Sequence, residues 1–307
     1  MEERQSRLSS TVWRRFRPYL CVRLILQNSM FSNFCHVLKP NHYVFIHLDK
    51  NADQQRFNMI QEERVTFIDN IYVTHGGFSL IMAEIMLMKA ALKSDVNFDY
   101  FHLISGHDYL CRSMSEFDSF FELNNGRSYM HYDSDEQHEQ WKTLITNRYV
   151  KWNLKDKGFN KFFRKAICYG LNRLLLKNVT FQLYAGWQWF SWHRTVVEYV
   201  LREIASHPTY LESFRYTNCC DEVIFHTMLW EHLEELNIDR NNSLRYIDWF
   251  PKRKYVTLPL ILDERDYVAI KESKAFFCRK VFIDRSVKLL DLLDADIDAK
   301  NKVNQKF

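Results

Sequence analysis

Between residues 42 and 132 the chain alternates short apolar segments with longer segments of helical character. Residues 42–50, 64–70, 99–106 and 128–132 predict buried strands, whereas residues 80–92 and 113–126 predict helices. When a helix connects two strands in this way, the strands usually lie parallel in one sheet. The sequence therefore predicts an α/β fold with a mostly parallel sheet that is flanked by helices.

In such sheets, ligands bind at the carboxyl ends of the strands. Here these ends carry four polar candidates, namely His47, Asp49, Ser105 and Asp108. Gly76 and Gly77 mark a turn before the helix predicted at residues 80–92, and Ser79 is expected to cap that helix. The sequence contains neither GxGxxG nor GxxxxGK[ST], which argues against dinucleotide-binding and P-loop proteins.

The composition of the chain indicates which partners it can bind and in which cellular compartment it is expected. The chain has 42 Lys and Arg residues against 38 Asp and Glu residues, and a net charge of +4 is too small for a dedicated nucleic-acid binder. Charged residues interrupt the apolar stretches, so no membrane-spanning helix is expected. Seven cysteines without a CxxC pair favour a reducing, cytoplasmic compartment.

Residues 141–180 carry most of the local positive charge, with ten Lys and Arg residues against the single acid Asp156. Apolar residues recur there at three- or four-residue spacing: Phe159, Phe163, Ile167, Leu171 and Leu174. This pattern predicts a basic amphipathic helix that lies at an anionic membrane surface. The alternative is a helix whose apolar side packs on the protein core while its charges face solvent.

Several residues in the second half of the chain could carry chemistry. Asp221 and Glu222 open a predicted helix at residues 220–233, either as favourable charges at its start or with Glu222 as a general base. The nearby indoles could stack on a sugar or fill the core; they are Trp187, Trp189 and Trp192. Arg245 and Lys280 are candidates for phosphate contacts.

A DxD sequence at residues 133–135 is a further candidate. Asp133 and Asp135 could hold a divalent cation against a diphosphate, because Mg²⁺ needs only one or two carboxylates when phosphate oxygens complete its shell. The alternative is an acidic loop without a metal.

Seven segments resemble, in the same order, those of a known enzyme family. They are FIHLDK (45–50), HGGFSLIMAE (75–84), DYFHLISGHDYL (99–110), GWQWFSWHR (186–194), YTNCCDEVIFHTML (216–229), LRYIDW (244–249) and FFCRKVF (276–282). Through them the chain resembles the Core-2/I-branching enzymes, the family of β-1,6-N-acetylglucosaminyltransferases and xylosyltransferases, and in particular its bacterial branch.

The resemblance implies a GT-A-like nucleotide-sugar-binding fold and an inverting transfer that needs no metal or other cofactor. It assigns Glu222 as the catalytic base, and Arg245 and Lys280 as the cations that bind the donor diphosphate. Such a transfer needs a base for the acceptor proton, and cations can stabilise the leaving group in place of a metal. Further pocket candidates are His47, Asp49, Gly76, Gly77, Ser105, Asp108, Trp189 and Asp221.

The resemblance also divides the chain. Residues 1–40 form an atypical N-terminal segment, with a degenerate candidate for the first strand at residues 19–27. Residues 41–285 form one GT-A-like domain, and residues 286–307 form a C-terminal helix or tail. Within the domain, a nucleotide-binding half (41–135) and an acceptor and catalytic half (184–285) flank the basic amphipathic insertion (136–183).

The implied function is transfer of a sugar, GlcNAc in β-1,6 linkage, from a UDP-sugar to a glycan in bacterial capsule or O-antigen synthesis. The enzyme would act in the cytoplasm, with residues 141–180 in peripheral contact with the inner face of the membrane. Three alternatives stay open. They are a xylosyl- or glucuronosyltransferase of the same family, a non-catalytic sugar-binding relative, and a glycoside hydrolase that pairs Glu222 with Asp108.

Overall fold

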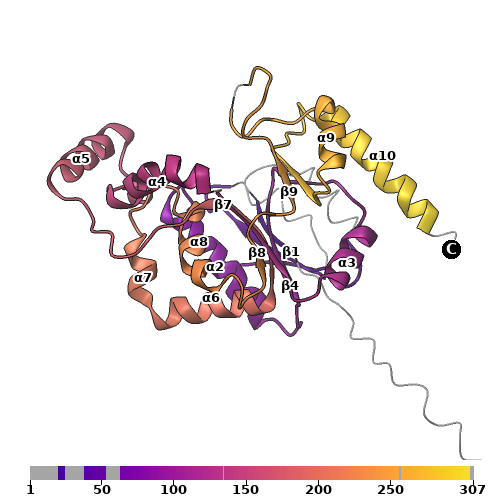
Figure 1. Cartoon of the computed structure of the whole chain (residues 1–307), viewed down its shortest axis with the longest axis horizontal. Helices are drawn as coiled ribbons and strands as arrows, with labels where there is room; N and C mark the ends of the chain where they lie inside the picture. The colour runs from indigo at the N-terminus through magenta and orange to yellow at the C-terminus, as the bar shows by residue number, and fades with distance from the viewer. Residues whose placement is uncertain (1–19, 25–37, 53–62, 134, 256, 305–307) are drawn as a thin grey trace, which may run out of the picture.

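The computed structural model describes residues 20–24, 38–52, 63–133, 135–255 and 257–304. A seven-stranded sheet lies at its centre, in the order β3-β2-β1-β4-β7-β6-β8 (Figure 1). All neighbouring strands pair parallel except at β7, which runs antiparallel to both of its neighbours. The predicted α/β fold with a mostly parallel sheet is therefore confirmed. The strands are β1 (Leu20–Leu24), β2 (Val44–Leu48), β3 (Val65–Phe67), β4 (Tyr100–Ser105), β6 (Ser128–Tyr132), β7 (Gly186–His193) and β8 (Ile238–Asp239).

Strand β1 falls within the degenerate segment 19–27 and joins two parts of the sheet. Its backbone pairs parallel with both β2 and β4, so that Val22 aligns with Ile46 on one side and with Ile104 on the other. The departure from the family pattern in this segment therefore does not prevent a central strand from forming.

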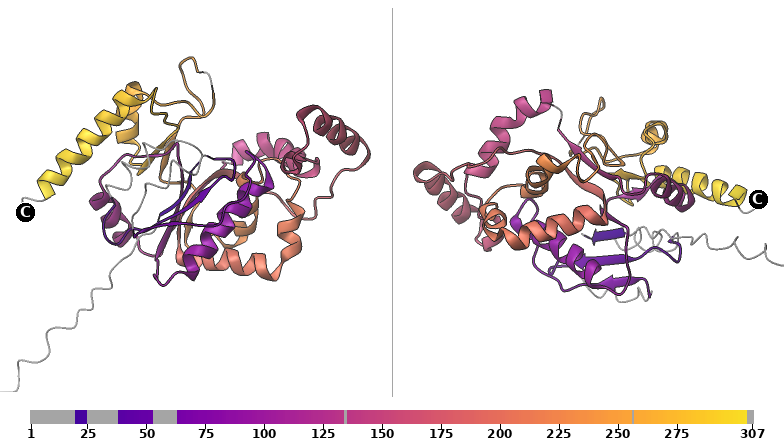
Figure 2. Two further views of the ribbon diagram at one scale, coloured as in Figure 1. Left: turned by 180° about the vertical axis from the view of Figure 1, so that it is seen from behind. Right: turned by 60° about the horizontal axis from the view of Figure 1, so that its bottom comes forward.

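Helices α2, α6 and α8 cover one face of the sheet (Figures 1 and 2). Side chains alternate between the two faces of a strand, so β4 directs Phe101 and Leu103 into the core beneath these helices. Trp192 of β7 joins the same core, where it is fully buried. The helices on this side are α2 (Phe78–Lys93), α6 (Arg194–Ser206), α7 (Pro208–Ser213) and α8 (Ile224–Leu229).

A smaller second sheet and helix α3 cover the other face. Phe117 and Phe121 of α3 pack with Phe277 of the small sheet and with Tyr100 and Ile104 of β4. Helices α9 and α10 lie outside this sheet and form a third cluster with it. The elements are α3 (Met114–Leu123), β5 (Tyr109–Leu110), β9 (Arg245–Ile247), β10 (Phe277–Arg279), α9 (Tyr267–Glu272) and α10 (Val287–Asn304), with strand order β5-β10-β9.

The basic segment forms two helices, α4 (Asp135–Val150) and α5 (Lys161–Leu174), joined through the 3-10 turn Lys155–Lys157. Helix α5 projects from the body of the molecule, at the left of Figure 1. None of its residues is buried. The interpretation that its apolar side packs on the protein core is therefore wrong.

The start of α2 also differs from the prediction. Gly77, not Ser79, is the N-cap, and because glycine has no side chain it cannot accept a capping hydrogen bond from the helix. Instead the Asp156 carboxylate accepts hydrogen bonds from the Ser79 backbone N–H at 3.0 Å and from Ser79 Oγ at 2.7 Å. The single acid of the basic segment thus provides the negative charge that favours a helix N-terminus.

Candidate functional site

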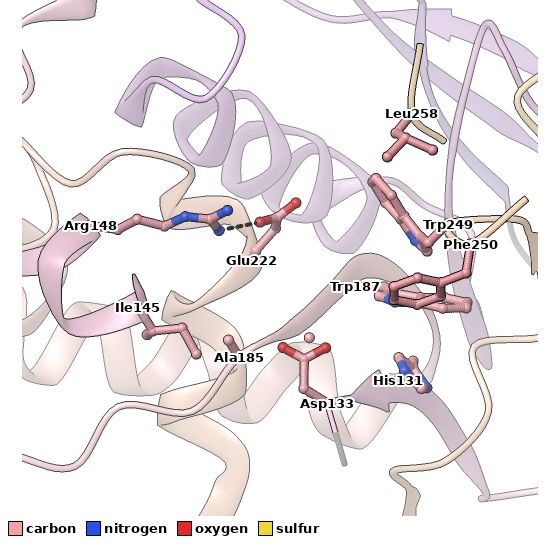
Figure 3. Close-up of a pocket in the computed structure, with 11 residues that line it drawn as sticks. His131, Asp133, Ile145, Arg148, Ala185, Trp187, Glu222, Trp249, Phe250 and Leu258 are labelled. Atoms are coloured by element: carbon pink, nitrogen blue, oxygen red, sulfur yellow. Dashed lines mark hydrogen bonds and ion pairs between the residues drawn. The ribbon is translucent and has the colours of Figure 1, made fainter. Parts of the chain in front are cut away.

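A cavity of about 280 Å³ opens beside the antiparallel strand β7 (Figure 3). This volume is at the small end of ligand sites and suits a single sugar ring. Polar groups and aromatic rings from distant segments meet there. The lining residues are His131, Asp133, Ile145, Arg148, Ala185, Gly186, Trp187, Glu222, Trp249, Phe250 and Leu258.

Glu222 reaches the cavity from a short 3-10 turn, Cys220–Glu222. The predicted continuous helix at residues 220–233 is wrong, since Val223 leaves helical geometry at φ −130° and separates this turn from α8. Arg148 of α4 donates a hydrogen bond to the Glu222 carboxylate at 2.6 Å. Asp221 is buried and does not line the cavity. Glu222 is therefore presented alone by a turn and held by a cation.

Aromatic rings form the side of the cavity that faces this ion pair (Figure 3). Trp187 projects from β7, and its ring lies 4.1 Å from the His131 ring, centre to centre. Trp249 and Phe250 follow β9 in the chain. Flat apolar faces opposite charged groups are the combination that binds a pyranose, whose C–H face stacks on indole while its hydroxyls seek polar partners.

Asp133 gives the cavity a second carboxylate. Its backbone N–H donates to the Ala185 carbonyl at 3.0 Å, which fixes it at the end of β6. Ser134 and the side chain of Asp135 lie outside the described residues, so the DxD sequence as a whole is not described. Among the described residues there is no group of three or more His, Cys, Asp or Glu side chains that could hold a metal ion.

The Gly76–Gly77 turn does not line the cavity but supports the segment that carries Glu222. The Gly76 carbonyl accepts the Cys219 backbone N–H at 2.9 Å. A Cβ at Gly76 would lie 2.9 Å from Cys219 Sγ and 3.1 Å from Lys155 Nζ, and the residue has φ +66°. Glycine is needed here both for the backbone conformation and for the close approach. The pair therefore positions the catalytic candidate indirectly.

Ser105 and Asp108 belong to a buried cluster at the end of β4. The Asp108 carboxylate accepts hydrogen bonds from the Ser105 N–H and hydroxyl, each at 2.6 Å, and lies 3.2 Å from Arg279 Nη1. The Arg279 guanidinium lies 3.7 Å from the centre of the Trp189 ring. Trp189 thus supports this arginine and is absent from the cavity, which receives Trp187 instead.

Lys280 lies next to this cluster and is partly buried. Its pKa is lowered by burial and by the neighbouring positive charge of Arg279. The centre of the His107 ring, whose pKa is also lowered by burial and by Lys280, lies 4.4 Å from that of the Phe282 ring, and the two rings are tilted by 34°. Lys280 does not line the cavity around Glu222. Trp189 and Trp187 are two residues apart on β7, where the pairing with β6 is irregular.

Arg245 does not have the place expected of a diphosphate ligand. Its side chain is buried between the two sheets, where its terminal N–H groups donate to the Ser191 hydroxyl at 2.7 Å and to the carbonyls of Leu103 at 3.0 Å and Phe190 at 2.7 Å, as well as to that of Ser243. Burial lowers its pKa to about 9. Arg245 does not line the cavity around Glu222, and its terminal N–H groups connect the two sheets. That it binds the donor diphosphate stays a prediction.

His47 and Asp49 are also structural. His47 Nε2 accepts the Ile71 backbone N–H at 3.1 Å. The Asp49 carboxylate accepts the backbone N–H groups of Asn51 at 2.7 Å and Val73 at 2.9 Å. Both side chains therefore connect the end of β2 to the segment after β3, and neither lines the cavity.

Reasoning from the sequence missed Arg148, Trp249 and Phe250 as cavity residues. No motif marks Arg148, which meets Glu222 only because α4 folds back over the 3-10 turn. Trp249 ends the segment LRYIDW, and an indole directly after a short strand was a signal that could have been used.

A mixed α/β sheet with this cavity at its antiparallel strand is consistent with a GT-A-like glycosyltransferase fold. A family profile described as "Branch: Core-2/I-Branching enzyme" matches residues 27–270. The chain belongs to this family.

Three curated relatives bear glycosyltransferase names. Xylosyltransferase 2 of Homo sapiens is 24% identical over 283 residues, which cover 84% of this chain and 31% of the relative. Beta-glucuronosyltransferase GlcAT14B of Arabidopsis thaliana is 23% identical over 274 residues, or 84% of this chain and 60% of the relative. Xylosyltransferase sqv-6 of Caenorhabditis elegans is 28% identical over 101 residues, or 30% of this chain and 12% of the relative. The matches thus span 12% to 60% of these relatives.

Proposed function

We propose that this protein transfers a sugar from a UDP-sugar to a glycan acceptor, with inversion at the anomeric carbon. The observation that carries the proposal is Glu222, held by Arg148 in a cavity with aromatic walls. Membership of the Core-2/I-branching enzyme family supports it. Asp108 is excluded as the second acid of the glycoside hydrolase alternative, because its side chain is fully buried against Arg279. That alternative would have to use Asp133, the other carboxylate of the cavity.

In the proposed reaction the acceptor sugar stacks on Trp187 and Trp249, and its hydroxyl faces Glu222. The carboxylate takes the hydroxyl proton while the acceptor oxygen attacks the anomeric carbon. The bond to UDP breaks as this new bond forms, and the diphosphate leaves with increased negative charge. Lys280 is the cation that we assign to this leaving group, because a preorganised positive charge stabilises it without a metal.

Two alternatives are open for the identity of the donor sugar. GlcNAc, expected from the resemblance, is one. Xylose or glucuronic acid is the other, and the names of the relatives favour it. The bacterial pathway and the place at the inner membrane face stay predictions.

UDP release from UDP-GlcNAc, UDP-xylose and UDP-glucuronic acid, measured in EDTA, tests the function without a known acceptor. We expect one donor to be hydrolysed slowly, and Glu222→Gln to lower that rate by about 10²-fold or more, since it removes the base. UDP binding by calorimetry should be unchanged in Glu222→Gln and weakened at least about tenfold in Lys280→Ala, the loss of one charged contact. Lys288→Ala, an exposed lysine on α10, is the matched control.

Each outcome is decisive for a different part of the proposal. Absence of UDP binding to the folded wild type would favour the non-catalytic sugar-binding alternative. Binding and turnover that appear only when a divalent cation is added would overturn the metal-independent mechanism. Unchanged turnover in Glu222→Gln would remove Glu222 as the base.

A further inference from the structure

Helix α5 and its flanks form an apolar surface that the rest of the described chain leaves uncovered. We call residues 159–176 the α5 surface. Phe162 is 85% exposed and Leu174 82% exposed. The other exposed apolar residues of this surface are Phe159, Phe163, Tyr169, Leu175 and Leu176. Exposed apolar side chains grouped in this way mark a surface that binds a partner or a membrane.

Basic residues lie at both ends of this apolar surface. Between residues 157 and 180 the chain has no Asp or Glu. The basic residues there are Lys157, Lys161, Arg164, Lys165, Arg173 and Lys177. A protein partner would need a matching acidic groove, whereas an anionic bilayer offers negative charge at its surface and hydrocarbon directly beneath it.

The way in which α5 is attached to the rest of the protein leaves the α5 surface accessible to a flat membrane interface. Trp152 connects α5 to the segment after α4: its backbone N–H donates to Asn172 Oδ1 at 2.6 Å, and its indole Nε1 donates to the Leu175 carbonyl at 2.7 Å. The helix stands away from the sheet in each view (Figures 1 and 2). Phenylalanines at its first turn and leucines at its end can therefore enter a flat interface together.

We infer that the α5 surface docks this protein on an anionic lipid bilayer, with α5 lying in the plane of the interface. Among the described residues no helix is long and apolar enough to cross a membrane. Docking would thus be peripheral and would depend on both apolar insertion and charge.

The position of α5 relative to the cavity gives the docking a consequence for substrate choice, which rests on the proposed function. A groove of about 370 Å³ between α4 and α5 includes Arg148 and Cys168. Arg148 also lines the cavity and pairs with Glu222. A bilayer that touches α5 therefore lies near the acceptor cavity, so the acceptor class is a glycan attached to a membrane lipid.

Flotation of the full chain with vesicles tests the docking independently of catalysis. We expect binding to vesicles of phosphatidylcholine with 30% phosphatidylglycerol (about one anionic lipid in three, enough to give a negative surface) and little binding to pure phosphatidylcholine. Binding should weaken as salt rises. The double variant Phe162→Ser with Phe163→Ser should lower the partition coefficient at least about tenfold, since each buried phenylalanine favours insertion.

The triple variant Lys161→Ala, Arg164→Ala and Lys165→Ala should lower binding to anionic vesicles about 100-fold, at about fivefold per charge. Leu123→Ser, 86% exposed on α3, and Arg202→Ala, exposed on α6, are matched controls that should bind as wild type. Equal binding of wild type and both α5 variants would overturn the inference. So would a stable dimer that the phenylalanine variant dissociates, because a second copy would then cover the surface. UDP binding in the same samples reports separately on the proposed function.

Discussion

At the scale of the residue, Arg245 and Lys280 differ in how their side chains are held, and this difference tests the roles proposed for them in the fold and in the reaction. Arg245→Met would remove the hydrogen bonds that this side chain donates to the buried carbonyls of Leu103 and Phe190 and to the Ser191 hydroxyl. We expect the free energy of unfolding to fall by about 3 kcal/mol or more. Lys280→Ala removes a partly buried cation without such partners and should change stability by less than about 1 kcal/mol.

Urea denaturation of both variants measures this difference, and calorimetry with UDP provides the second readout. Lys280→Ala should remain folded and bind UDP weakly. A stable Arg245→Met variant that binds no UDP would contradict the structural role and restore Arg245 as a donor ligand.

A comparison of Glu222 with Arg245 explains which site residues could be predicted from the sequence. Glu222 stands in a recognisable acidic pair, and the structure places it in the cavity. The side chain of Arg245 has the right chemistry for a phosphate, but its burial between two sheets depends on contacts more than 50 residues away in the chain. Residue type therefore indicates chemistry, whereas tertiary packing decides whether the group is available.

At the scale of the element, the Gly76–Gly77 turn supports the 3-10 turn that carries Glu222. Gly76→Ala would force a side chain into a position with φ +66° and against Cys219 Sγ. We expect a loss of about 1–2 kcal/mol from the backbone conformation alone, and a further loss of UDP-sugar turnover as the turn shifts. Thermal unfolding and the UDP-release assay measure the two effects.

Gly158→Ala provides a matched control, because Gly158 has the same φ of +66° but no heavy atom within 4 Å of the added Cβ. It should lose similar stability and keep full turnover. Equal turnover in the two variants would contradict the positioning role of Gly76.

Elements were predicted more reliably than their ends and interruptions. Strong periodicity placed the strands and helices between residues 42 and 132 correctly, since β2, β3, α2, β4, α3 and β6 all fall there. The predicted helix at residues 220–233 is instead three short pieces, because Cys219 adopts φ 52° and Val223 interrupts the helix. The Cys219 N–H donates to the Gly76 carbonyl, and such a contact between distant segments leaves no apolar pattern in the sequence.

At the scale of the whole molecule, the packing of the second sheet and of helix α8 against the central sheet buries histidines that must stay neutral. His102 lies fully buried between the layers, with Nδ1 2.9 Å from the Ser191 hydroxyl, and burial and Arg245 hold its pKa well below the usual value. His226 is also fully buried and donates from Nε2 to the His131 carbonyl at 3.1 Å, and burial lowers its pKa to about 3. Neither of these lowered pKa values could be predicted from the sequence, because the sequence does not show how deeply a side chain is buried.

Stability should therefore fall in mild acid. Below pH 6.5, the ordinary value for histidine, the unfolded chain binds protons that the folded protein refuses, so stability is constant above this pH and decreases below it. By pH 5 each such histidine lowers the free energy of unfolding by about 2 kcal/mol. In His226→Gln the new side chain cannot titrate and keeps an N–H for the His131 carbonyl. We measure the free energy of unfolding by urea denaturation at pH 7.5 and at pH 5. The decrease between these pH values should be about 2 kcal/mol smaller in His226→Gln than in wild type. An equal pH dependence in wild type and His226→Gln would contradict the lowered pKa of His226 in the folded protein.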